Sequence, residues 1–136
     1  MITLINPPGI KPVASLNMNS PSPPLGLAYI AGTLRGAGYV FHVIDATGAA
    51  FDQIRPYPER KDFLVQGLTV DEIVARIPSD TDIVGFSCIF SSVWPLTRGV
   101  AHAVRHRFPK ALLVLGGEHG TAVPEYSLRE GPFDVI

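Results

Sequence analysis

The chain has 136 residues, of which 46% are hydrophobic and 17% charged, and its formal net charge is -1. This composition predicts a single globular domain and excludes a disordered chain, and the near-neutral charge gives no electrostatic case for binding nucleic acid or an anionic membrane. The single cysteine, Cys88, excludes an internal disulfide and a cysteine-held iron–sulfur cluster within the chain, and it fits the reducing cytoplasm that we expect.

The N-terminal half predicts two strands and a helix. Apolar runs and their breaks indicate, in chain order, a strand at 2–6, a long Pro/Ser-rich loop at 10–24, a helix at 25–37 that Gly38 caps, and a strand at 39–45. The start of the chain has no basic region, so we expect no signal peptide, and no apolar run approaches the roughly 20 residues of a membrane span. Residues 46–67 mix prolines with charged residues and predict an irregular surface excursion with one helical turn.

The C-terminal half alternates helices with strands. Thr69 with Glu72 three residues later forms a capping box that opens a helix through Ile77. The remaining pattern predicts a strand at 82–87, a helix at 95–108, a strand at 111–115, a short helix at 121–129 and a strand from Phe133 to Ile136.

This alternation predicts an α/β fold: a doubly wound, Rossmann-like or flavodoxin-like parallel sheet of five strands in the order 2-1-3-4-5, with helices on both faces. We expect one domain over residues 1–136. Because the final strand is followed by no helix, we expect that the chain is an N-terminal fragment of a longer protein or that a partner covers this edge.

Two strands end in a way that predicts a binding site. The buried run 112–115 is followed at once by Gly116 and Gly117, and the strand 82–87 ends at Ser87. Ligands of open α/β sheets bind outside the carboxyl ends of the strands, and glycines there allow a large group to approach the backbone. The loops at this edge offer small hydroxyl, glycine and apolar residues, which suits a large, mostly apolar ligand.

Other common motifs are missing or ambiguous. The chain has no Walker loop, no Gly-x-Gly-x-x-Gly and no Gly-x-Ser-x-Gly. His102 and His106 share one helix face without an evident third ligand, so we expect a solvated surface there. His119 contacts a ligand, coordinates a metal centre or caps the helix near Thr121. Cys88 is expected to be a buried apolar residue.

Five segments together resemble one family. They are Asn6-Pro7-Pro8-Gly9, residues 23–31, residues 38–46, Asp82–Ser87 and Gly116-Gly117-Glu118-His119. In this order they resemble the cobalamin (B12)-binding domain at the N-terminus of many radical S-adenosylmethionine enzymes, and within these the anaerobic magnesium-protoporphyrin IX monomethyl ester cyclase branch. The resemblance covers nearly the whole chain.

The resemblance implies a site for the nucleotide tail of cobalamin. In that family the tail lies beside a Ser-x-Leu and a Gly-Gly. Here Ser87-Cys88-Ile89 matches the first, with Ile in place of Leu, and Gly116-Gly117 matches the second. Leucine at position 117 should then block the tail and leave the fold intact. The residues that we expect to contact the cofactor are Pro8, Leu25, Gly26, Ser87, Ile89, Phe90, Ser91, Gly116, Gly117, Glu118 and His119.

Two family motifs are missing, and both limit the chain's role. The Asp-x-His-x-x-Gly that supplies a cobalt ligand is not present, so the resemblance implies base-off cobalamin without a protein histidine, and we expect no metal-ligating residue. The Cys-x-x-x-Cys-x-x-Cys is also missing, so we expect no catalytic residue here. A C-terminal barrel of the longer protein would be the partner and would hold the 4Fe-4S cluster and S-adenosylmethionine.

Two alternatives remain open at this point. One is a docking or structural domain of the same fold that has lost its cofactor. The other is a flavin-binding, flavodoxin-like protein, although Pro23 and Pro24 lack backbone donors where a flavin phosphate would need them.

Overall fold

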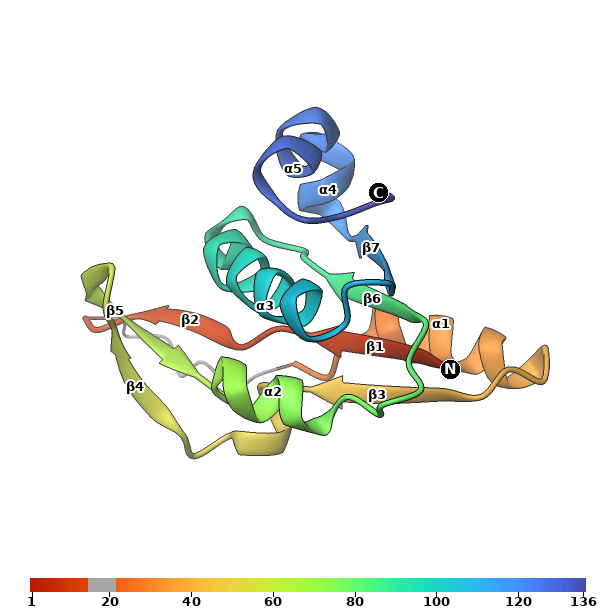
Figure 1. Ribbon diagram of the computed structural model, residues 1–136. Helices are drawn as coiled ribbons and strands as arrows, with labels where there is room; N and C mark the ends of the chain where they lie inside the picture. Colours follow the sequence, from red (N-terminus) through yellow and green to blue (C-terminus); the bar gives the residue numbers. More distant parts are fainter. Residues whose placement is uncertain (15–21) are drawn as a thin grey trace.

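The protein is built around a four-stranded parallel sheet. The computed structural model describes residues 1–14 and 22–136, so the middle of the predicted loop at 10–24 lies outside the described residues. The strands are β1 (Ile2–Asn6), β3 (Phe41–Asp45), β6 (Ile83–Ser87) and β7 (Leu112–Gly116). They lie in the order β3-β1-β6-β7, and every neighbouring pair is parallel (Figure 1). This order confirms the one predicted for the first four strands.

The predicted fifth strand is wrong. Past β7 the chain returns to the sheet, but only Val135 forms a parallel bridge, to Val114. Next to this bridge, the Asp134 carboxylate accepts a hydrogen bond of 2.8 Å from the backbone N–H of Leu113. A side chain therefore takes part of the β7 edge that a fifth strand would pair with.

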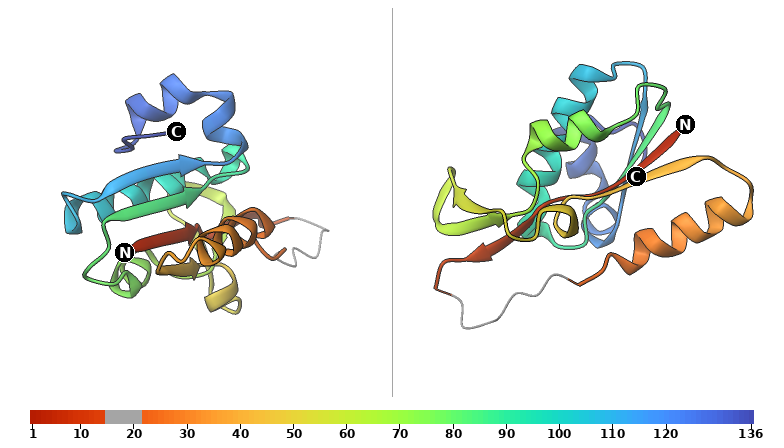
Figure 2. Two further views of the ribbon diagram at one scale, coloured as in Figure 1. Left: turned by 90° about the vertical axis from the view of Figure 1, so that its right-hand side faces the viewer. Right: turned by 90° about the horizontal axis from the view of Figure 1, so that it is seen from below.

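Helices cover the two faces of the sheet, as predicted. Helix α1 (Leu25–Gly36) lies on one side, and α2 (Val70–Arg76) and α3 (Trp94–Arg107) lie on the other (Figure 2, right). The cluster under α1 is small and consists of Leu4, Leu27 and Ala31. The cluster on the other face forms the main core and includes Ile5, Ile73, Phe86, Val100 and Leu115.

Local sequence signals set the helix ends. The Thr69 hydroxyl accepts the backbone N–H of Glu72, and the Glu72 carboxylate accepts the backbone N–H of Thr69, which confirms the capping box of α2. Gly38, with φ of 79°, ends the turn after α1. The predicted helix at 121–129 is instead two short helices, α4 (Glu118–Ala122) and α5 (Pro124–Glu130), because Pro124 has no N–H to continue the first.

A small antiparallel sheet was not predicted. It consists of β2 (Gly9–Pro12), β5 (Arg60–Gln66) and β4 (Ile54–Tyr57), in the order β2-β5-β4. The expectation of an irregular excursion at 46–67 is therefore wrong, although its one helical turn is present as the 3-10 helix η1 (Gly48–Ala50). This sheet extends from the carboxyl ends of β1 and β3 (Figure 1), where it adds a wall to the site described next.

No helix among the described residues is both long enough and apolar enough to cross a membrane.

Candidate functional site

The carboxyl edge of the parallel sheet carries a row of side chains that becomes smaller from one side to the other. Asn6 pairs with Asp45 and donates a 2.8 Å hydrogen bond to its carboxylate. Ser87 pairs with Gly116 on the neighbouring strands. Because alternate residues of a strand point to opposite faces, and Phe86 lies in the main core, Ser87 and Gly116 belong to the α1 face. The row therefore ends with the hydroxyl of Ser87 beside Gly116, which has no side chain.

A pocket of about 540 Å³ opens at this edge, within the range typical of sites for organic ligands. Its walls are the turn from β1 to β2, the start of α1, the loop after β6 and residues of two strands of the small sheet, β2 and β5. Six predicted residues line it, namely Pro8, Leu25, Gly26, Ser87, Ile89 and Phe90.

The other predicted residues lie beside or behind this pocket. Gly116, Gly117 and Glu118 are exposed at the adjoining end of β7. Ser91 starts the 3-10 helix η2 (Ser91–Val93), whose next two residues do line the pocket. His119 is buried, so its side chain lies behind the exposed glycines and not on the surface of the site.

Sequence reasoning missed the wall that the small sheet provides. Thr47 and Gln66 line the pocket and are both buried. The Thr47 hydroxyl donates to the carbonyl of Pro7 over 3.1 Å, and the Gln66 amide donates to the carbonyl of Phe51 over 2.8 Å. The first bond holds the turn after β1, and the second joins β5 to the residue that follows η1. Both depend on contacts between distant parts of the chain, which no local sequence pattern indicates.

The two glycines of β7 have different environments. A Cβ at Gly116 would lie 3.6 Å from the carbonyl oxygen of Phe86, which is an ordinary contact. Gly117 has φ of 100° and ψ of 173°, and a Cβ there would lie 2.5 Å from the carbonyl oxygen of Cys88. The expectation that leucine at position 117 would leave the fold intact is therefore wrong, whereas Gly116 has room for a side chain.

His119 lies in a buried stack. Its ring packs on Trp94 with the centroids 4.6 Å apart, and its Nδ1 shares a hydrogen bond of 2.9 Å with the Ser91 hydroxyl. Burial lowers the pKa of His119, which favours the neutral form of the ring. His119 lies inside α4, and the N-caps of α4 and α5 are Gly117 and Val123, which removes the capping role from its three predicted roles.

Cys88 is buried, as predicted, and burial raises the pKa of its thiol. The protonated form is therefore favoured, which is consistent with a packing role and not with a nucleophile.

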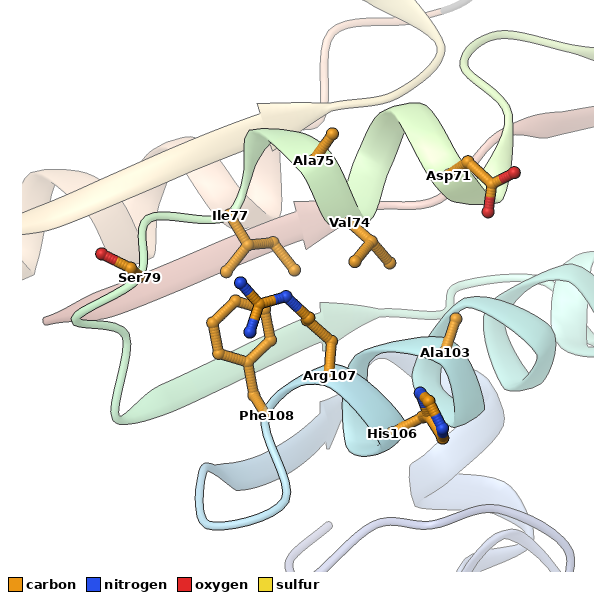
Figure 3. Close-up of a pocket in the computed structure, with 9 residues that line it drawn as sticks. All are labelled: Asp71, Val74, Ala75, Ile77, Ser79, Ala103, His106, Arg107 and Phe108. Carbon is orange, nitrogen blue, oxygen red and sulfur yellow. The ribbon is translucent and has the colours of Figure 1, made fainter.

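Other parts of the described chain offer weaker sites. Among these residues no group of three or more His, Cys, Asp or Glu side chains could hold a metal ion. A groove of about 430 Å³ lies between α2 and α3, on the face opposite α1, where Asp71, His106 and Arg107 lie around an apolar floor that includes Val74 and Ile77 (Figure 3). His102 and His106 are exposed, as predicted.

Comparison with known proteins identifies the family. The model of the B12 binding domain matches residues 12–136. The chain belongs to the B12-binding domain family. The match covers α1, β3, β6 and β7, whereas β1 and the lining residues from Asn6 to Lys11 precede it.

Two curated relatives carry this domain within longer proteins. One is the cytidylyl-2-hydroxyethylphosphonate methyltransferase of Streptomyces wedmorensis, 30% identical over 114 residues, which are 83% of this chain and 21% of the relative. The other is an uncharacterized methyltransferase of Pyrococcus horikoshii, 30% identical over 132 residues, which are 96% of this chain and 24% of the relative. The chain thus spans about a quarter or less of either relative. No solved structure matches.

Proposed function

We propose that this chain binds cobalamin at the carboxyl edge of its parallel sheet, with the nucleotide tail against Ser87 and Gly116. The pairing of these two residues carries the proposal, because it sets a hydroxyl beside a glycine in an open row. A flat heterocycle can approach the backbone only where no Cβ intervenes, and the hydroxyl can then hydrogen-bond one of its nitrogens.

The space between α1 and the sheet supports this position for the nucleotide tail. The Arg35 guanidinium lies 6.0 Å from the ring centre of Phe41 on β3, so that side of α1 faces the β3 edge. Gly26, nine residues earlier, lies on the opposite side of the helix and faces β6. A Cβ at Gly26 would meet none of the described atoms within 4 Å. The tail would enter between Gly26 and the Ser87–Gly116 pair.

We propose that the cofactor binds base-off, without a histidine ligand from this chain. The segment after β1, where the wider family has its cobalt-ligating histidine, here forms the turn of Pro7 and Pro8 and then β2. The described lining of the pocket contains no imidazole, and its one charged residue is Lys11. Apolar and backbone groups of this wall would face the lower side of the corrin ring.

We further propose that the chain is the cofactor module of a longer methyltransferase. Both relatives are named methyltransferases and are four to five times as long as the matched region. When bound, cobalamin supplies a cobalt centre that can carry a methyl group. A radical S-adenosylmethionine domain outside this chain would hold the iron–sulfur cluster and supply the methyl donor. The names of these relatives favour methyl transfer over the cyclase reaction.

Calorimetric titration of the purified 136-residue chain tests the binding proposal. We expect hydroxocobalamin to bind at least about tenfold more tightly than cobinamide, which lacks the nucleotide tail, a difference of about 1.4 kcal/mol. Equal affinities would contradict the position of the tail. If neither corrinoid binds at high micromolar concentration, the chain is a docking domain without a cofactor. Preferential binding of flavin mononucleotide would instead support the flavin alternative.

A further inference from the structure

The loop after β6 and the loop after β7 are tied together behind the pocket. The backbone N–H of Cys88 donates to the carbonyl of Gly116 over 2.8 Å, and the backbone N–H of His119 donates to the carbonyl of Cys88 over 3.1 Å. A third link joins side chains, between the Ser91 hydroxyl and Nδ1 of His119 at 2.9 Å. The first two links would form with many sequences, whereas the third requires these two side chains.

The imidazole of His119 is not explained by packing alone. The residue is 5% exposed, and its Nε2 has no hydrogen-bond partner among the described residues. A buried polar atom without a partner destabilises the fold. A phenyl ring of similar shape could stack on Trp94 with no such atom. What only the imidazole supplies in this place is the hydrogen bond to Ser91.

Ser91 is the residue through which this bond reaches the pocket. It follows Ile89 and Phe90, which line the pocket and are exposed, and it precedes the lining residues Ser92 and Val93. Its carbonyl accepts the backbone N–H of Trp94, so Ser91 is fixed at both its side chain and its backbone. A fixed Ser91 determines where the residues on either side of it lie.

We propose that His119 is a positioning residue that holds the loop of residues 88–92 in place through Ser91. This inference rests on the proposed function, since this loop is a wall of the pocket that we assign to cobalamin. His119 acts from behind the wall and does not contact the cofactor. It sets the distance between the apolar residues of the loop and the glycines of β7.

Amide hydrogen exchange of the unliganded chain tests directly whether His119 holds the loop of residues 88–92 in place. We expect His119→Phe and Ser91→Ala each to speed exchange over residues 88–93 by about three- to tenfold, the range that loss of one net hydrogen bond gives. His119→Asn, which places an amide near the former Nδ1, should restore much of the protection. His106→Phe and Ser79→Ala, at exposed positions beside the groove between α2 and α3, are the matched controls.

Hydroxocobalamin titration of the same variants tests the link to the pocket. We expect the dissociation constant to rise about three- to tenfold in each single variant and no further in the double variant, because both changes remove one bond. Three results would each overturn the proposal. They are unchanged exchange in Ser91→Ala, equally faster exchange in His119→Phe and His119→Asn, and additive effects of the two substitutions on affinity. If the wild-type chain binds no corrinoid, the proposed function fails, and the exchange data still decide whether His119 positions the loop.

Discussion

Substitutions at two adjacent glycines, Gly116 and Gly117, should affect ligand binding and stability separately. Gly116 and Gly117 both match the Gly-Gly motif, yet the structure assigns them different constraints. Gly116 has a backbone conformation open to any residue and ordinary contact distances. Gly117 lies in a region of backbone space essentially confined to glycine, and a side chain there would collide with Cys88. We therefore predict that Gly116 governs ligand binding and that Gly117 governs stability.

The expected magnitudes follow from these geometries. Replacing Gly117 with Ala should cost about 1–3 kcal/mol in backbone strain. For a domain of this size that lowers the Tm by roughly 3–15 °C. Replacing Gly116 with Ala should leave the Tm unchanged or slightly higher, since the loss of a glycine restricts the unfolded chain by about 0.4–1 kcal/mol. Gly116→Leu places a large side chain over Ser87, and overpacking of about 1–3 kcal/mol should weaken hydroxocobalamin binding roughly five- to 150-fold.

Thermal unfolding followed by circular dichroism, and titration with hydroxocobalamin, measure the two effects separately. Gly32→Ala is the matched control for added volume, because Gly32 lies on α1 outside the pocket lining and its Cβ enters open space. Wild-type affinity in Gly116→Leu would refute the assignment of the tail to this pair of strands. Wild-type stability in Gly117→Ala would refute the close approach of the two loops.

Two further predictions concern the fold. Ile73 is fully buried between α2 and the sheet, so Ile73→Ala should lower the free energy of unfolding by about 2–5 kcal/mol, as measured by urea denaturation. The control Val70→Ala, at a more exposed position, should lower it much less. A loss for Ile73→Ala no larger than that of the control would contradict this description of the core. Hydrogen bonds from the backbone and side chain of Thr69, and from Gln53, lower the pKa of Glu72 to about 2. Unfolding therefore takes up a proton at acid pH, so the stability from this carboxylate is present above pH 4.5 and is lost as the pH falls towards 2. Glu72→Gln should flatten the fall in stability over this range in denaturation curves at several pH values, and an unchanged slope would count against the capping box.

The sequence predicts the parallel sheet well because its signals are local. Four apolar runs, the Thr69–Glu72 capping box and the turn at Gly38 each depend on residues close in the chain. The alternation of strands with helices predicts parallel strands whose carboxyl ends meet at one edge, and the flavodoxin-like strand order then makes Ser87 and Gly116 neighbours. These two residues could therefore be assigned to one edge without knowledge of the structure.

The small sheet was missed because prolines were interpreted as breaks. Pro12 lies in β2 and Pro56 in β4, and both strands are at the edges of a sheet whose centre is β5. Proline is tolerated on an edge strand, where one side of the backbone pairs with nothing in the sheet. The pairing of β2 with β5 joins residues more than 50 positions apart, and no local pattern encodes it.

The position of the His119 side chain could not be predicted from local sequence either. Its partners, Ser91 and Trp94, lie 28 and 25 residues earlier in the chain, in a loop whose path depends on the approach of Gly117 to Cys88. Sequence placed His119 after two glycines and hence on the surface of the site. The structure turns the ring inward because α4 starts directly after Gly117.

The absorption spectrum of the wild-type chain, incubated with hydroxocobalamin and desalted, tests the central claim most directly. We predict a retained corrin band that shifts on reduction to the form in which the nucleotide base has left the cobalt. Gly116→Leu, treated in the same way, should retain much less corrinoid. A folded wild-type chain that emerges colourless would contradict the claim that this pocket binds cobalamin.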